Sequence, residues 1–256
     1  MDRGVVRYYR TADDYRRYTV TDRQRRAAID RLYRRHRREF GRSVLDLACG
    51  GGVLGAVLER SGRRYLGVDV SPDMIRAARK AAKVEGSARE FRRGNIARLS
   101  VPGRFDTVTL LGNALGHVRI AEMEGLLDHL ARNVHRGSTF LLDYRDVVGM
   151  LWDGSWARRG FTQQHKRGKV VFRSRSADLG KGVIHIRGRP ATRGAWIADF
   201  THAMWSPYIL AALMRAHGWT LARRSSPRIP RTGQPEANYW EDVYRYDGRS
   251  RIPRPA

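Results

Sequence analysis

The hydrophobic positions of the chain follow different patterns on either side of residue 43. Residues 1–42 are polar and basic, and their apolar side chains form only a thin stripe at helical spacing. This stripe predicts a helix from about Thr21-Asp22 to Glu39. Its members are Ala28, Ile29, Leu32, Tyr33 and Phe40.

From Ser43 onward, short apolar runs alternate with amphipathic segments. The runs predict strands over 44–47, 65–68, 88–92, 105–111 and 139–143. The segments between them predict helices over 53–60 and 120–134, and one that begins at Ser71-Pro72 and carries Met74, Ile75, Ala78 and Ala82 on one side. Strands that alternate with helices favour a parallel sheet covered by helices on both faces.

The pattern changes again over residues 161–205. Strands are expected over 161–165, 169–176, 182–189 and 195–205, with turns between them, which predicts an antiparallel insertion. A helix over 207–217 ends at Gly218, and two strands, 219–224 and 238–246, close the main sheet around a proline-rich loop over 227–235. The predicted fold is α/β, a Rossmann-like sheet with a small antiparallel β insertion.

Four parts follow from this division of the chain. Residues 1–42 are expected to form an N-terminal helical lid, and 43–145 the ligand-binding core. Residues 146–206 are the insertion on the substrate side, and 207–256 hold the last helix and the closing hairpin.

The strand over 44–47 continues into a glycine-rich turn, Ala48-Cys49-Gly50-Gly51-Gly52, and then into a helix. Glycine lets a backbone approach a ligand where a Cβ atom would clash, and a helix N-terminus then faces the ligand's polar groups. The turn differs from the dinucleotide pattern G-x-G-x-x-G, because Asp46 precedes Gly50 by four residues and Ala48 stands at the first glycine.

Two further turns carry polar side chains at strand ends. Asp69 ends the second strand, 19 residues after Gly50, a spacing that suits a carboxylate accepting hydrogen bonds from both ribose hydroxyls. Gly94-Asn95-Ile96 follows the third strand and suits an adenine ring, with the Asn95 amide and the apolar Ile96 as contacts.

Together with Phe105-Asp106-Thr107-Val108, these motifs resemble those of class I S-adenosylmethionine (SAM) dependent methyltransferases over about residues 40–145. Within that superfamily, Leu111-Gly112-Asn113-Ala114-Leu115-Gly116-His117, Leu142-Asp143-Tyr144-Arg145-Asp146 and Tyr18 to Arg25 are similar to elements of the glycine/sarcosine N-methyltransferases. The resemblance departs at Phe172 and at Trp205-Ser206-Pro207, where that family has tyrosines. Another small amine or amino acid is therefore also a candidate substrate.

The resemblance implies roles for individual residues. Tyr18 and Arg25 would close over the methionine end of SAM, Asp69 would hold the ribose, and Asn95 the adenine. The full cofactor-binding set is Tyr18, Arg25, Asp46, Ala48, Gly50, Gly52, Asp69, Val70, Met74, Asn95, Ile96 and Leu111, and it includes no metal ligand.

The same resemblance places the substrate at Asn113, Arg145 and His117. Arg145 follows a predicted central strand, so its guanidinium can reach the ligand crevice and bind a carboxylate through a forked contact. Asn113 is either a second donor to that carboxylate or a turn residue, and His117 is either part of the cofactor wall or a structural histidine. The base that deprotonates the amine stays open among His117, a tyrosine and solvent.

Composition adds an extreme charge to this picture. The formal net charge is +25, and 45 of the 50 basic residues are arginine, spread through nearly every segment. This indicates non-specific affinity for nucleic acid, and it leaves two rivals: a methyltransferase of RNA or protein, and a non-enzymatic nucleic-acid binding protein. The intact Asp46, Gly50, Gly52 and Asp69 argue against the second, and the absence of an Asn-Pro-Pro-Tyr-type run after Leu111 argues against a nucleic-acid amino-methylating enzyme.

Other compositional features bound the setting. No apolar run approaches the roughly 20 residues that span a bilayer, Met1 to Arg10 lack the apolar stretch of a signal peptide, and the one cysteine, Cys49, excludes an intrachain disulfide. We expect a cytoplasmic enzyme whose partner is a small-molecule substrate with a carboxylate and not a membrane, and we leave homo-oligomerisation open.

Overall fold

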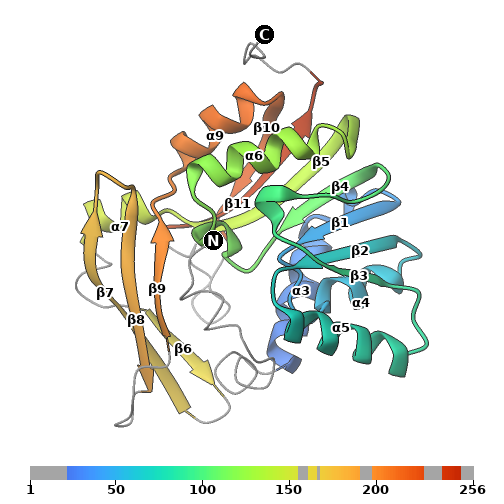
Figure 1. The fold of residues 1–256 in the computed structure, drawn as a ribbon, viewed down its shortest axis with the longest axis horizontal. Helices are drawn as coiled ribbons and strands as arrows, with labels where there is room; N and C mark the ends of the chain where they lie inside the picture. Colours follow the sequence, from blue (N-terminus) through green and yellow to red (C-terminus); the bar gives the residue numbers. More distant parts are fainter. Residues whose placement is uncertain (1–21, 155–160, 166–167, 191–197, 228–237, 249–256) are drawn as a thin grey trace.

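The computed structural model describes residues 22–154, 161–165, 168–190, 198–227 and 238–248. A seven-stranded sheet in the order β10-β11-β5-β4-β1-β2-β3 forms its centre (Figure 1). The strands are β1 (Ser43–Leu47), β2 (Arg64–Asp69), β3 (Glu90–Arg93), β4 (Phe105–Leu110), β5 (Val134–Arg145), β10 (Trp219–Ser225) and β11 (Tyr239–Tyr246).

The pairing of the strands confirms the predicted α/β sheet. β1 is parallel to β2 and β4, β2 to β3, and β4 to β5. β11 runs antiparallel to both β5 and β10, so it is the strand of this sheet that departs from the common direction. The carboxyl ends of the parallel strands consequently gather at one edge, where ligands bind in open α/β sheets.

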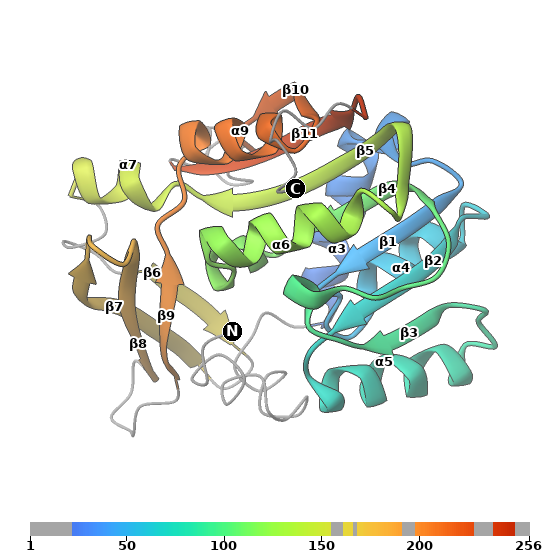
Figure 2. The same cartoon turned by 45° about the horizontal axis from the view of Figure 1, so that its top comes forward.

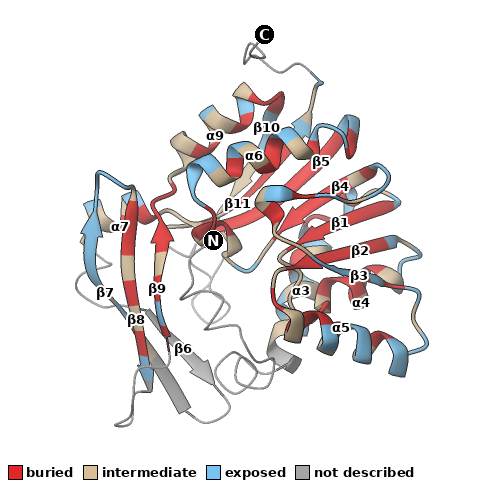
Figure 3. Ribbon diagram, viewed as in Figure 1, coloured by how far each residue is buried: buried red, intermediate tan, exposed pale blue. Residues whose placement is uncertain are grey.

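Helices cover both faces of this sheet. α3 (Asp22–Arg35), α4 (Val53–Glu59) and α5 (Pro72–Val84) bury Leu32, Leu58 and Ile75 in one apolar cluster. α6 (Ile120–Leu130) and α9 (Pro207–Ala216) bury their apolar sides in a second cluster. Successive residues of β1 point to opposite clusters, Val44 to the first and Leu45 to the second, so both faces of the strand are dry (Figure 3).

A separate four-stranded antiparallel sheet confirms the predicted insertion. Its strands β6 (Phe161–His165), β7 (Gly168–Asp178), β8 (Val183–Pro190) and β9 (Ala198–Ala203) pair in sequence order. It stands across from the carboxyl ends of the parallel strands (Figure 2). Phe172, Ile184, Ile186 and Phe200 form a small core with α7 (Val147–Trp152).

Several predicted boundaries were wrong for local physical reasons. The helix predicted over 120–134 ends at Leu130, because the Asn133 side chain donates to the carbonyls of Val101 and Gly103 and fixes a turn. Val134 then begins β5. The predicted N-terminal helix ends at Arg35 and gives way to a 3-10 turn, Arg37–Glu39.

The helix α7 was not predicted, since its six residues are too few to show a period. The Asp146 side chain initiates it by accepting a hydrogen bond from the Gly149 backbone at 2.8 Å. None of the helices described combines the length and apolar character that crossing a membrane requires.

Candidate functional site

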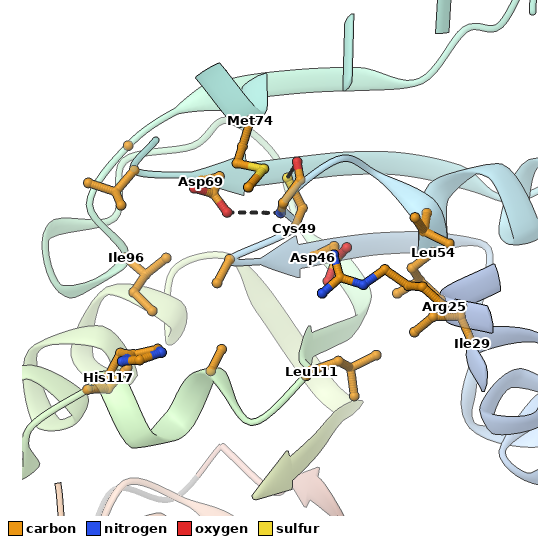
Figure 4. Close-up of a pocket in the computed structure, with 18 residues that line it drawn as sticks. Arg25, Ile29, Asp46, Cys49, Leu54, Asp69, Met74, Ile96, Leu111 and His117 are labelled. Atoms are coloured by element: carbon orange, nitrogen blue, oxygen red, sulfur yellow. Dashed lines mark hydrogen bonds between the residues drawn. The ribbon is translucent and has the colours of Figure 1, made fainter. Parts of the chain in front are cut away.

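A cleft of about 1050 Å³, open to solvent, lies at the carboxyl ends of β1, β2 and β4 (Figure 4). Ten residues of the predicted set line the cleft: Arg25, Asp46, Ala48, Gly50, Asp69, Val70, Met74, Ile96, Leu111 and His117. The topology therefore gathers residues that lie up to 92 positions apart in the sequence at one site.

The glycine turn after β1 forms the floor of the cleft. Ala48, Gly50 and Gly52 all have positive φ angles, of 55°, 53° and 74°. A Cβ atom on Gly50 would meet nothing within 4 Å, so the space above it is open to a ligand. A Cβ atom on Gly52 would lie 2.6 Å from the Phe91 ring, and Gly52 is not among the lining residues. Gly52 thus packs the turn against the core.

Asp69 lies beside this turn, at the end of β2. One carboxylate oxygen accepts a hydrogen bond from the Gly50 backbone at 2.9 Å, and the other accepts one from the Ser71 backbone at 2.8 Å. Burial raises the pKa of Asp69, and these backbone donors offset part of the rise. The Val70 backbone acts in the same way, and because a carboxylate offers about four acceptor sites, Asp69 keeps capacity for a ligand hydroxyl.

Asp46 is buried at the inner end of the cleft. It accepts hydrogen bonds from the Tyr65 hydroxyl at 2.6 Å and the Thr109 hydroxyl at 2.7 Å. Burial raises its pKa to about 6, although both hydroxyls act in the opposite direction. The Arg25 side chain reaches into the cleft from α3 on this side (Figure 4).

The opposite wall is largely apolar and comes from the turns after β3 and β4. Gly94 and Ile96 line it, but the Asn95 side chain accepts a hydrogen bond from the Ala97 backbone at 3.0 Å and starts a 3-10 turn, Ile96–Arg98. Asn95, predicted as an adenine contact, therefore has a local capping bond and is not among the lining residues.

Asn113 and Arg145 lie side by side at the ends of β4 and β5, and neither is among the lining residues. The Asn113 backbone donates to Asp143 at 2.7 Å, and its side-chain oxygen accepts the Arg145 backbone N–H at 3.0 Å. The Arg145 guanidinium lies over the Tyr239 ring, 5.2 Å from its centroid. The predicted pair is thus adjacent, with the Asn113 oxygen already used to join the two strand ends.

His117 joins the cleft to the smaller sheet. Its ring packs edge-on against His202 of β9, with centroids 4.6 Å apart, and against Phe200 at 5.3 Å. Tyr18, the remaining predicted residue, lies outside the described residues.

Eight lining residues were not predicted: Ile29, Cys49, Val53, Leu54, Gly94, Gly112, Ala114 and Val118. Cys49, Gly94 and Gly112 are next to predicted residues, so the motif itself was a signal for them. Ile29 belongs to the apolar stripe of α3, which the sequence predicts as a core face and which carries no sign of a ligand. Burial raises the pKa of the Cys49 thiol well above its usual value, which keeps it protonated.

Comparison with known proteins agrees with this geometry. Residues 44–137 match the family described as "Methyltransferase domain". A cypemycin N-terminal methyltransferase of a Streptomyces species is 33% identical over 156 residues, which cover 59% of this chain and 61% of that protein. A ubiquinone biosynthesis O-methyltransferase of Methylococcus capsulatus is 36% identical over 80 residues, 30% of this chain and 33% of that protein. The chain thus spans less than two thirds of these relatives.

Solved structures show the same fold over nearly the whole chain. The CcbJ methyltransferase of Streptomyces caelestis has a TM-score of 0.70 at 19% identity and covers 94% of this chain and 98% of its own. The SAM-bound amino pentose methyltransferase CalS10 of Micromonospora echinaspora has a TM-score of 0.60 at 17% identity, with 87% and 90% covered. Residues 44–137 therefore match a methyltransferase domain, and the chain as a whole has the fold of these solved methyltransferase structures.

Proposed function

We propose that the protein transfers the methyl group of SAM to the nitrogen of a small amine or amino acid. The observation that carries the cofactor half is the floor of the cleft, where the open Gly50 backbone and the buried Asp69 carboxylate lie within one hydrogen bond of each other. A nucleoside needs such an arrangement, because a close backbone approach and a carboxylate for the ribose hydroxyls must occur together.

SAM, when bound, supplies a methyl group already activated on a sulfonium. The chain's own residues then have to bind, orient and exclude water. Asp69 would hold the ribose, and Ile96, Leu111 and Val118 would exclude water from the apolar wall. Alignment of a nucleophile with the methyl carbon can supply about 7–11 kcal/mol of the barrier.

The choice of nitrogen as acceptor rests on likeness. The motifs resemble those of glycine/sarcosine N-methyltransferases, and the similar proteins include an N-terminal methyltransferase and an amino pentose methyltransferase. Because the chain is also similar to a ubiquinone biosynthesis O-methyltransferase, a hydroxyl group is the alternative acceptor. A polyanion acceptor is the second alternative, because the net charge is +25.

A methyl-transfer screen tests the proposal. Protein and radiolabelled SAM are incubated with glycine, sarcosine, ethanolamine, a short peptide with a free N-terminus, catechol and total tRNA. We expect label on the small amines or amino acids. Label found on catechol alone would contradict nitrogen as the acceptor atom, and label found on tRNA alone would contradict a small-molecule acceptor. No label on any acceptor would contradict the methyltransferase activity itself.

A further inference from the structure

His202 is a buried imidazole at the junction of the two sheets. Its side chain is on β9 of the smaller sheet, and the residue is 4% exposed. Among the described residues its Nε2 atom has no hydrogen-bond partner. A buried polar atom without a partner is rare in folded proteins and calls for an explanation such as a ligand or a catalytic role.

The surroundings of His202 connect it to the cleft. Its ring lies 4.6 Å from the ring of His117, which lines the cleft, and 5.1 Å from that of Phe200. A Cβ atom on Gly116 would stand 3.0 Å from Nδ1 of His202, so the absence of a side chain there makes room for the imidazole. His202 is therefore held one ring away from the cleft wall.

Two other charged or titratable groups act on His202 from the elements packed around it. They are His117, in the turn after β4, and Arg145, at the end of β5. Burial first, and then these two groups, hold the pKa of His202 well below its usual value. The imidazole is neutral near pH 7 and can accept a proton.

We infer that the junction of His117, Phe200 and His202 is the acceptor subsite, and that His202 accepts the proton released by the acceptor's nucleophile. This inference rests on the proposed function. It extends that function by naming a base for the N–H or O–H nucleophile, and by coupling that base to the anionic group that Arg145 would bind.

The electrons, the proton and the charge of the proposed step are all accounted for within the site. The nucleophile's lone pair forms the bond to the methyl carbon, and the electron pair of the breaking carbon–sulfur bond stays on sulfur. The proton of the nucleophile passes to the neutral imidazole. One positive charge thus leaves the sulfonium, and one appears on His202.

The charge of Arg145 favours an acceptor that is anionic. Its positive charge opposes formation of the imidazolium on His202. A carboxylate bound to the guanidinium offsets that charge, so the bound acceptor itself makes His202 a better base. With an uncharged acceptor, the charge of Arg145 continues to disfavour protonation of His202.

Paired substitutions test the role of the imidazole. His202→Phe keeps a ring of similar size. The matched control is His217→Phe, because His217 is also buried and its Nε2 atom has no hydrogen-bond partner among the described residues. Unlike His202, His217 lies at the end of α9. With the best acceptor of the screen, we expect His202→Phe to lower kcat by about 100-fold or more and to remove the imidazole limb of the pH–rate profile. SAM affinity by calorimetry stays within about twofold, and His217→Phe keeps the wild-type profile.

An NMR titration measures the protonation of His202 directly, without requiring turnover. The His202 signal, identified by its loss in His202→Phe or in His202→Gln if the first does not fold, is followed against pH in the presence of S-adenosylhomocysteine. Acetate should raise the pKa of His202, which corresponds to a rise in proton affinity of about tenfold or more. Acetamide, which is uncharged, should leave the pKa unchanged. In Arg145→Gln, acetate should no longer have this effect.

The outcomes separate the two proposals. Wild-type kcat and pH profile in His202→Phe, or a His202 pKa that acetate leaves unchanged, would overturn the inference even if the protein methylates amines. If no acceptor of the screen is methylated, the proposed function fails, and the acetate titration alone decides whether this junction binds an anion next to a neutral imidazole.

Discussion

At the scale of single residues, the cleft separates groups that face a ligand from groups that hold the turn. Asp69 is the clearest member of the first class, because both of its oxygens are oriented by backbone N–H groups beside open space. Asp46, Gly52 and Asn95 were predicted alongside it, but their contacts are largely internal to the protein. The sequence motif contains residues that face the ligand and residues that hold the turn, and only their contacts in the structure distinguish the two.

Asp69→Ala should weaken SAM binding measured by calorimetry, because two hydrogen bonds to a carboxylate, worth about 1.5–3 kcal/mol each, would be lost. Asp73→Ala is the control, since Asp73 lies in the first turn of α5 and outside the cleft lining. Unchanged SAM affinity in Asp69→Ala would remove the ribose from this position.

The glycines of the turn give a matched pair. Gly52→Ala should lower the free energy of unfolding by about 1–3 kcal/mol, because its Cβ atom would overlap Phe91 and its φ of 74° disfavours a side chain. Gly50→Ala, with open space above it, should be less destabilising and should weaken SAM binding more. Urea unfolding and calorimetry on both variants check this, and the opposite order would contradict the division.

The raised pKa of Asp46 predicts a dependence of stability on pH. The folded pKa of about 6 exceeds the ordinary 3.8, so the folded state keeps a proton that the unfolded state releases in this interval, and the stability due to Asp46 is lost as pH rises through it. At 1.36 kcal/mol per pKa unit the loss is roughly 3 kcal/mol. Relative to Asp46→Asn, the wild type should be stabler at the acid end of the interval than above it, by urea unfolding. A pH-independent difference would show that Asp46 does not titrate there.

At the scale of elements, one buried carboxylate joins the N-terminal helix to the sheet. Glu241 of β11 is 2% exposed and bonds to Arg35 at 3.1 Å and to His36 at 2.8 Å. The other nitrogen of the His36 ring contacts Arg223 of β10 at 2.8 Å. Because α3 carries Arg25 and Ile29 to the cleft, this cluster also positions one wall of the site.

We therefore expect Glu241→Gln to act on stability and on ligand binding together. Removing the charge leaves His36 and Arg35 with a weaker partner. Hydrogen bonds to a charged group are worth about 1.5–3 kcal/mol, and the Arg35 side chain is 42% exposed, so the cost lies toward the lower end. Tm should fall and SAM affinity should decrease with it. Asp30→Ala breaks the exposed Asp30–Arg60 pair between α3 and α4 and should cost under about 1 kcal/mol. Equal effects of the two variants would contradict the role of Glu241.

At the scale of the whole molecule, the cationic residues outnumber the acidic residues by 50 to 25, so half of them cannot have an acidic partner of their own. Exposed arginines occur on both sheets. Arg173 on β7 and Arg245 on β11 are examples, and Arg245 pairs with Glu39. The charge is distributed over the molecule and is separate from the apolar wall of the cleft.

This separation predicts different responses to salt. Raising salt from low to moderate concentration should abolish RNA binding in a filter or mobility assay, because counterion release weakens with salt, while methylation of the small acceptor stays nearly constant. A parallel fall of both with salt would favour a polyanion acceptor.

The sheet, the glycine turn and the position of Asp69 at a strand end are predictable from the sequence, because they depend on local periods and on residues adjacent in the chain. Ser71 and Pro72 start α5, and its four predicted apolar positions are buried, as the spacing required. Short elements such as α7 escaped prediction, since six residues show no period and the Asp146 cap is only evident once its partner is placed.

Only the tertiary structure decided which side chains share the cleft. Ile29 and Val118 reach it through the packing of α3 and of the turn after β4, and His202 comes next to His117 because β9 pairs into a separate sheet that returns to the strand ends. Such contacts join residues far apart in the chain and depend on strand order, which no local pattern specifies. Local sequence patterns therefore predict the glycine turn, and the strand order decides which side chains surround it.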